Sequence, residues 1–236
     1  TRLCLFDLDQ TLLPIDSDHA WGEFLIRLGW VDADEFRAGN DAFYEAYQVG
    51  QLDIHAYVAF VTAPLQRRDA ATLASAHVRF MREVIVPRIE PAALELVNGH
   101  RERGDLLCLV TATNDFVTAP IAAAFGIEHL IAVRLERTPG GTITGVIEGT
   151  PSYREGKVAR VGEGLQGMDR DWDDFESITV YSDSPNELPL PERADWSRWL
   201  AENPRDDAIA VAIRRVRLLE QLGAQVHPVA ADVAVA

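Results

Sequence analysis

The sequence predicts an α/β fold in which a parallel sheet core is interrupted by an inserted all-helical cap domain. A short apolar run at residues 3–8 predicts a buried strand, and the stretch 16–88 carries apolar residues at helical spacing without a strand pattern. After residue 88, helical stretches alternate with continuous apolar runs, which are typical of buried parallel strands. We therefore expect a core of residues 1–15 and 89–236 and a cap of residues 16–88.

Apolar stripes at helical spacing predict four helices in the cap: Trp21, Phe24 and Leu25; Phe43, Tyr44 and Tyr47; Tyr57, Val58 and Val61; and Val78, Met81 and Ile85. Asp53 precedes the third stripe and is expected to cap that helix, because an aspartate side chain accepts from free backbone N–H groups.

The core segment has its own order of elements, which alternates helices with strands. The expected helices are 91–103, 115–125, one that begins near Lys157, and 208–222. The expected strands are 106–110, 130–133, 178–181 and 196–200, with a hairpin over 133–149. Such alternation implies a parallel sheet covered by helices on both faces.

Composition narrows the class of protein. The chain has 236 residues, of which 47% are hydrophobic and 25% charged, and its formal net charge is −15. These values predict a soluble globular protein, and the acidic balance argues against nucleic acid and anionic membranes as partners. Cys4 and Cys108 lie in apolar runs and are expected to be buried thiols. No apolar run reaches the roughly 20 residues that span a bilayer, so a cytoplasmic protein is expected.

Polar side chains gather just after three of the predicted strands. Asp7 and Asp9 follow the first strand, the segment 111–114 follows the second, and the segment 183–187 follows a later one. Ligands in open α/β sheets bind outside the carboxyl ends of the strands, so these groups are expected to meet. Lys157, the single lysine among 22 basic residues, begins a helix between the last two segments.

Such a cluster suits phosphate chemistry. Carboxylates at one sheet edge repel each other unless a cation lies among them, and hard oxygen ligands in an open site favour Mg²⁺. A phosphate dianion fits beside Mg²⁺, the Lys157 ammonium and the N–H groups at helix starts. Asp7 is the candidate nucleophile, and Asp9 is the candidate general acid and base. Asp9 has to start protonated, so we expect its pKa to be raised: its carboxylate neighbours raise the pKa, whereas Mg²⁺ and Lys157 lower it.

These residues resemble the motifs of a known family. Asp7-Leu8-Asp9-Gln10-Thr11 resembles the DxDxT signature of the haloacid dehalogenase superfamily of phosphatases, and Thr111-Ala112-Thr113-Asn114 resembles its second motif. Lys157 resembles the third motif, and the acidic segment 181–190 the fourth. All four occur in the family's order, most closely as in phosphoserine-phosphatase-like hydrolases with a helical cap. The resemblance implies a Rossmann-like core.

The resemblance also implies a role for each matching residue. Asp7 would form an aspartyl-phosphate, and Asp9 would act as general acid and base. The implied Mg²⁺ ligands are Asp7, the main-chain carbonyl of Asp9, and Asp183. The residues implied to bind substrate or its phosphate are Thr111, Ala112, Asn114, Lys157, Asn186 and Asp16. Thr11 and Glu187 are expected to support these groups from behind.

The chain departs from the family pattern at two places. Glu187 stands where the fourth motif usually ends in Asp, and the extra methylene puts its role as a metal group in doubt. Ala59 aligns with the cap arginine that binds the carboxylate of phosphoserine. Asp16 falls near the cap acid that meets the substrate amine, although Asp16 and Asp18 can equally cap the first cap helix.

The sequence thus predicts a Mg²⁺-dependent phosphomonoester hydrolase that acts on a small phosphorylated metabolite through an aspartyl-phosphate. Phosphoserine itself is the less favoured substrate. Two alternatives stay open at this point, a non-catalytic phosphoacceptor or metal-binding module and a phosphotransferase to an alcohol acceptor. The segment 162–167 matches GxGxxG but follows a helical stretch, so a nucleotide-binding turn is not expected there.

Overall fold

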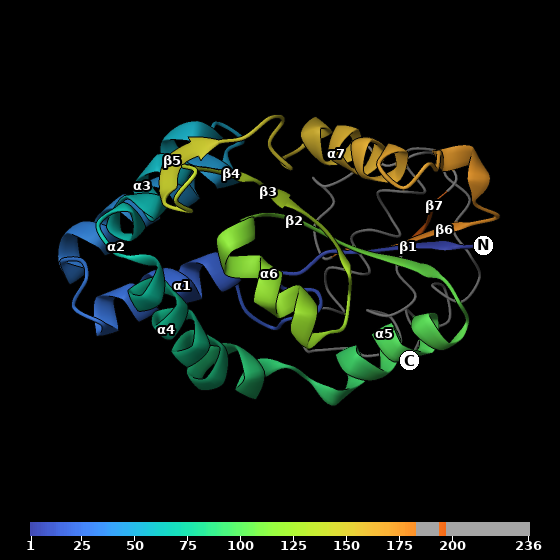
Figure 1. Ribbon diagram of the computed structural model, residues 1–236, viewed down its shortest axis with the longest axis horizontal. Helices are drawn as coiled ribbons and strands as arrows, with labels where there is room; N and C mark the ends of the chain where they lie inside the picture. Colours follow the sequence, from blue (N-terminus) through green and yellow to red (C-terminus); the bar gives the residue numbers. More distant parts are fainter. Residues whose placement is uncertain (183–193, 197–236) are drawn as a thin grey trace.

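The computed structural model of the chain describes residues 1–182 and 194–196. Five parallel strands of this part form one sheet in the order β3-β2-β1-β6-β7 (Figure 1). The strands are β1 (Leu3–Phe6), β2 (Leu106–Asn114), β3 (His129–Val133), β6 (Ile178–Tyr181) and β7 (Ala194–Trp196). The predicted α/β class with a parallel core is confirmed. The predicted helix 208–222 and most of the strand 196–200 lie outside the described residues.

Strand β1 occupies the centre of the sheet. Leu3 pairs with Leu106 of β2 on one side and with Ile178 of β6 on the other. The chain builds β2 and β3 on one side of β1 and β6 and β7 on the other, so the strand order reverses between β1 and β6. Such a reversal leaves a crevice at the carboxyl ends of the strands, and Asp7 directly follows the last residue of β1.

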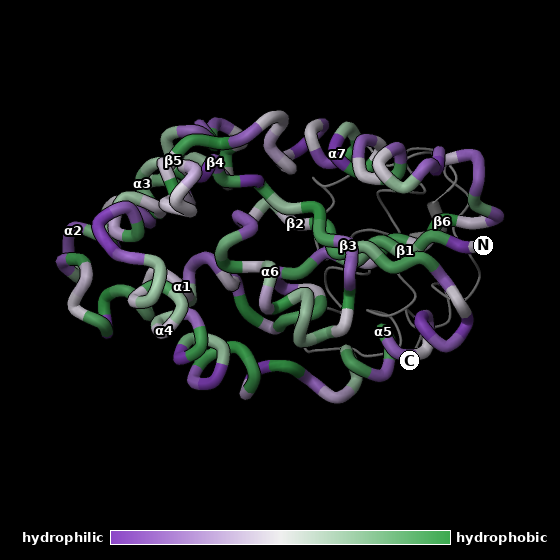
Figure 2. The backbone as a smooth tube through the Cα atoms, in the orientation of Figure 1, coloured by the Kyte–Doolittle hydropathy of each residue, from purple (hydrophilic) through white to green (hydrophobic). Residues whose placement is uncertain are grey.

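Alternate residues of β1 bury themselves on opposite faces of the sheet. Cys4 and Phe6 join the apolar cluster that contains α5 (Pro91–Glu102) and α6 (Asp115–Ala124), whereas Leu3 and Leu5 join the cluster that contains α7 (Glu155–Gln166). Figure 1 shows α5 and α7 on opposite sides of the strands, and Figure 2 shows the hydrophobic course of β1 and β2 between them. Burial of each large side chain stabilises the fold by about 1.5–3 kcal/mol.

Four helices form the region predicted as the cap, and they gather at the end of the molecule away from the N-terminus (Figure 1). They are α1 (Ser17–Arg27), α2 (Ala33–Gln48), α3 (Ile54–Gln66) and α4 (Ala70–Phe80). Each follows an aspartate whose side chain accepts from backbone N–H groups of the first turn: Asp16, Asp32, Asp53 and Asp69. The four predicted helices and the Asp53 cap are confirmed. No helix among the described residues is long and apolar enough to cross a bilayer.

Two of the predicted apolar stripes are partly wrong. Tyr44 and Tyr47 of α2 are exposed, and Tyr47 instead lies near the ring of Tyr153. Val78 is 66% exposed, because the buried side of α4 is formed by Leu73, Ala76 and Phe80. The chain leaves α4 through a π-helical turn at Met81–Ile85 before a 3₁₀ turn at Val86–Arg88, and the wider turn places Ile85, five residues after Phe80, in the core.

The predicted hairpin is confirmed, and it packs against a cap helix. Strands β4 (Leu135–Arg137) and β5 (Ile143–Ile147) pair antiparallel, and β5 lies along α3. Gly145 has a φ of +86°, and a Cβ atom there would overlap the side chain of Gln66. Glycine is favoured here mainly by this positive φ, because the end of the Gln66 side chain can move aside. The division between cap and core stays a prediction.

Helix α7 carries the segment that formally matches GxGxxG. Gly162 and Gly164 lie within this helix and Gly167 follows its last residue, so the segment is not a strand-to-helix turn. A fourth glycine, Gly156, lies in the first turn of α7, directly before Lys157. A Cβ atom at Gly156 would overlap the carbonyl oxygen of Pro151, which belongs to the rigid backbone. The position of Lys157 therefore depends on a glycine at 156.

We predict that Gly156→Ala lowers the free energy of unfolding by about 1–3 kcal/mol, because the methyl group overpacks the start of α7. Gly162→Ala is the matched control, because its Cβ would meet only the Trp172 side chain at an ordinary 3.4 Å. Higher helix propensity should stabilise this control by up to about 1 kcal/mol. Urea unfolding of both variants measures the difference, and equal stability for the two would contradict the assigned clash.

Candidate active site

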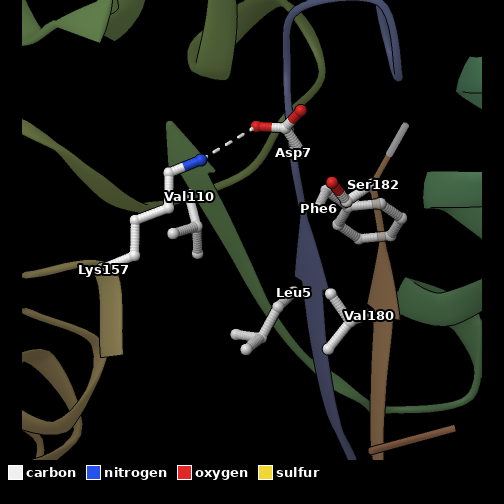
Figure 3. A pocket seen from close by; sticks show the side chains of 7 residues that line it. All are labelled: Leu5, Phe6, Asp7, Val110, Lys157, Val180 and Ser182. Carbon is white, nitrogen blue, oxygen red and sulfur yellow. Dashed lines mark hydrogen bonds and ion pairs between the residues drawn. The ribbon is translucent and has the colours of Figure 1, made fainter. Parts of the chain in front are cut away.

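Asp7 lies at the carboxyl end of the central strand and is only 7% exposed. Its backbone N–H donates to the carbonyl oxygen of Tyr181 at 2.8 Å, which continues the β1–β6 ladder. The Thr11 hydroxyl donates to Asp7 Oδ2 at 3.3 Å, and Lys157 Nζ lies 3.5 Å from Oδ1 (Figure 3). A small cavity adjoins this pair, and its lining residues are Leu5, Phe6, Asp7, Val110, Lys157, Val180 and Ser182.

Lys157 is 3% exposed, although lysine is rarely buried without a partner. It reaches Asp7 from the first turn of α7, on the side of the sheet where that helix packs. Asp7 supplies the opposite charge, which offsets the cost of burying the ammonium group. The two residues are 150 positions apart in the sequence. The structure therefore brings Asp7 and Lys157 together at one edge of the sheet, as predicted.

Asp9 is held between the first cap helix and the end of β2. The backbone N–H of Ser17 donates to Asp9 Oδ1 at 2.6 Å. Thr113 Oγ1 donates to Asp9 Oδ2 at 2.9 Å, and Thr111 Oγ1 approaches the same oxygen at 3.4 Å. Thr111 and Thr113 are two residues apart on one strand, so their side chains point to the same face and can share one acceptor.

The pKa of Asp9 lies well above its ordinary value. Burial raises the pKa to about 7, and the negative charge of Asp16 adds to the rise. Hydrogen bonds from Ser17 and Thr113 oppose it, because they stabilise the ionised form. The predicted direction of the shift is confirmed, and a carboxyl group with this pKa can hold a proton near neutral pH.

Two of the predicted site residues, Asp16 and Asn114, cap helices. Asp16 caps α1, with Oδ1 accepting from the N–H groups of Asp18 and His19, so the capping interpretation is confirmed for Asp16 but not for Asp18, which is the second residue of the helix. Asn114 caps α6 by accepting from the N–H of Val117. Contact of Asp16 or Asn114 with a substrate stays a prediction, as does that of Ala112, which lies between the two threonines on β2. Asp183, Asn186 and Glu187 lie outside the described residues.

Residues that sequence reasoning missed also reach this site. Thr113 is the shortest side-chain donor to Asp9, and its two-residue spacing from Thr111 was the available signal. Asp18 is buried on α1, and the Tyr57 hydroxyl of α3 donates to its Oδ2 at 2.6 Å. Burial raises the pKa of Asp18 to about 7; Asp16 and Asp9 add to the rise, and the Tyr57 hydrogen bond opposes it. Ala59, which aligns with the cap arginine, lies on α3 and is exposed.

The donor chemistry of the site suits a hard cation. Asp7 brings carboxylate oxygens and Asp9 a main-chain carbonyl oxygen to the end of β1, and oxygen donors of this kind are the ligands that Mg²⁺ prefers. Within residues 1–182, no group of three or more His, Cys, Asp and Glu side chains is arranged to hold a metal. Asp183, the third predicted ligand, follows Ser182, which lines the same cavity as Asp7.

Comparisons with solved structures agree with this fold. A crystal structure of a protein of unknown function from Bordetella pertussis Tohama I is 43% identical, with a TM-score of 0.78 that covers 97% of this chain and 98% of that one. A substrate-bound phosphoserine phosphatase is 19% identical, with a TM-score of 0.50 over 75% of this chain and 76% of that one. At this low identity, the second likeness shows the fold alone.

Sequence comparisons agree with the motifs. A histidinol-phosphatase of Neisseria meningitidis serogroup C (strain 8013) is 43% identical over 189 residues, which cover 80% of this chain and 85% of the relative. The family model for haloacid dehalogenase-like hydrolases matches residues 4–192, a range that contains Asp7, Thr111, Lys157 and Asp183. The chain belongs to the haloacid dehalogenase-like hydrolase family and is an enzyme of its phosphatase type.

Proposed function

We propose that this enzyme is a Mg²⁺-dependent phosphomonoester hydrolase that forms an aspartyl-phosphate on Asp7. The observation that supports it best is the buried pair of Asp7 and Lys157, 3.5 Å apart at the end of the central strand. Asp9, two residues on, is held by separate hydrogen bonds and has a pKa of about 7. A nucleophile, a fixed positive charge and a protonated acid thus occupy one edge of the sheet.

The proposed reaction has two steps, and each residue has one task in each. An Asp7 oxygen attacks phosphorus while the bond to the leaving oxygen breaks, and Asp9 gives that oxygen its proton. Asp9 then accepts a proton from water as the water attacks the phosphoryl group, which frees phosphate and restores the Asp7 carboxylate. Lys157 and the Thr111 hydroxyl stabilise the negative charge on the phosphoryl oxygens throughout.

Mg²⁺ would be held by Asp7, the main-chain carbonyl of Asp9 and Asp183, and it would neutralise charge on the phosphate and carboxylate oxygens. Hydrolases of this family generally use Mg²⁺, and the oxygen donors of Asp7 and Asp9 fit that ion. The protein's own residues orient the phosphate and move the proton, because Asp9 is fixed by α1 and β2 rather than by a metal.

For the substrate, we propose histidinol phosphate or a closely related ester of an amino alcohol. Support comes from the histidinol-phosphatase that is 43% identical over most of both chains. Support also comes from Ala59, because the position that aligns with the carboxylate-binding arginine of phosphoserine phosphatases offers no cation here. Histidinol phosphate carries an amine and an imidazole ring but no carboxylate, so it needs no such arginine.

Of the two alternatives, phosphoryl transfer to an alcohol uses the same first step and differs only in the acceptor. Water is the acceptor that the proposal favours, and transfer to an added alcohol in excess of phosphate release would favour the alternative. A stable phosphoacceptor module has no need of a protonated acid two residues after its phosphorylated side chain. The raised pKa of Asp9 therefore favours an enzyme over that module.

We predict that the enzyme releases phosphate from p-nitrophenyl phosphate with Mg²⁺ and that Asp7→Asn lowers kcat by at least about 1,000-fold, because the nucleophile is lost. Asp41→Asn, at an exposed position of α2, is the control and should keep wild-type activity. A wild-type enzyme without Mg²⁺-dependent release, or an active Asp7→Asn variant, would exclude the proposed reaction.

Lys157→Arg should lower kcat by about 100-fold or more while the fold stays intact, because a planar guanidinium cannot replace a compact buried ammonium beside Asp7. The reverse exchange at the surface, Arg82→Lys, is the control and should leave kcat unchanged. Steady-state kinetics and circular dichroism of both variants provide the measurement. Full activity in Lys157→Arg would remove the ammonium from the proposed mechanism.

The substrate proposal predicts a kcat/KM for histidinol phosphate at least about tenfold above that for phosphoserine, because the second ester buries a carboxylate without a partner. Phosphate release from both esters under identical conditions gives the ratio. A preference for phosphoserine would show that another cation of this chain meets the carboxylate and that Ala59 is not informative.

A further inference from the structure

The inward side of α1 carries a carboxylate oxygen that lacks a partner. Asp18 is 8% exposed, and its Oδ2 accepts from the Tyr57 hydroxyl at 2.6 Å. Asp18 Oδ1 is buried and has no hydrogen-bond partner in the described part of the chain. Buried polar atoms are nearly always paired, so this exception points to a group that is supplied from outside the protein.

The surroundings of Asp18 are negative. No ion pair joins Asp18 to an arginine or lysine within residues 1–182, and the charges close enough to act on it belong to Asp9 and Asp16. A buried carboxylate is costly unless a cation or several donors satisfy it. An ammonium group supplies both a positive charge and three donors, so it matches the unpaired Asp18 Oδ1.

Asp18 also lies beside the proton donor. The backbone N–H of the preceding residue, Ser17, is the 2.6 Å donor to Asp9 Oδ1. Asp9 is proposed to protonate the leaving alcohol, so groups around this contact face the leaving part of the substrate. One turn further along the same buried side, Trp21 contacts the ring of Phe116 with 5.5 Å between centroids. Aromatic side chains thus follow the carboxylate on the buried side of α1.

Asp16 differs from Asp18 in each of these respects. Its Oδ1 already caps α1, the residue is exposed, and it lines an open groove with His19 and Glu23 on the outer side of the helix. The buried carboxylate with an unpaired oxygen is therefore Asp18, two residues after Asp16, the position that the motif alignment suggests.

We propose that Asp18 is the specificity-determining residue of this site and that its Oδ1 binds the protonated amine of an amino-alcohol phosphate. This inference rests on the proposed phosphatase function and adds the residue that selects the leaving group. Tyr57 is a positioning residue, because its hydroxyl fixes the other carboxylate oxygen. The substrate class is a primary phosphate ester whose alcohol carries an ammonium group.

The test measures binding and turnover separately. Calorimetry with histidinol, the product alcohol, gives a dissociation constant without any catalysis. Asp18→Asn should weaken histidinol binding by about 10- to 100-fold, because a charge-assisted hydrogen bond is replaced by a neutral one. Asp34→Asn is the matched control, since Asp34 holds the equivalent second position of α2 but is exposed. Unchanged binding in Asp18→Asn, or absence of histidinol binding to the wild type, would overturn the inference.

Turnover is compared on 2-aminoethyl phosphate and propyl phosphate, which differ by an ammonium in place of a methyl group. Asp18→Asn should lower the ratio of their kcat/KM values by about tenfold or more, and an equal loss on both esters would overturn the inference.

If no ester is hydrolysed with Mg²⁺, the proposed function fails and histidinol binding still decides the role of Asp18. Tyr57→Phe should weaken histidinol binding by about fivefold, and it decides the matter if Asp18→Asn does not fold.

Discussion

The buried pair of Asp7 and Lys157 is the constraint on which the rest of the site depends. A carboxylate at the end of a central strand is surrounded by protein, so it keeps its charge only with a partner close by. The single lysine of a chain with net charge −15 supplies that partner. Gly156 brings the start of α7 against Pro151, and this packing is what carries the ammonium to the sheet edge.

Asp9 joins the proposed chemistry to the helical region. Its two carboxylate oxygens are divided between the start of α1 and the end of β2, so the position of α1 sets the orientation of the proposed acid. The same helix carries Asp18, whose second oxygen is tied to α3 through Tyr57. The proposed selection of the leaving group and the proposed protonation of its oxygen therefore both depend on α1.

Much of the fold and part of the site were predictable from the sequence. Buried parallel strands appear as continuous apolar runs, and Asp7, Thr111 and Lys157 follow such runs or begin helices at family spacing. Asp18 escaped prediction because an acid in the first turn of a helix has an ordinary explanation as a dipole or capping partner. Thr113 escaped because threonine is a common strand residue. Tyr44, Tyr47 and Val78 were misjudged because helical spacing does not reveal a π-turn or which side of a helix meets the core.

The hairpin of β4 and β5 limits how the helical region can move. Besides the two chain crossings that bound residues 16–88, β5 lies along α3, and the Arg154 side chain donates to the carbonyl oxygen of Gly50 at 2.6 Å just before α7. A body held at two points can rotate about the line between them, but a third attachment off that line removes this rotation. A displacement of the helices would therefore also strain the contact between Gly50 and Arg154, the residue directly before the helix that carries Lys157.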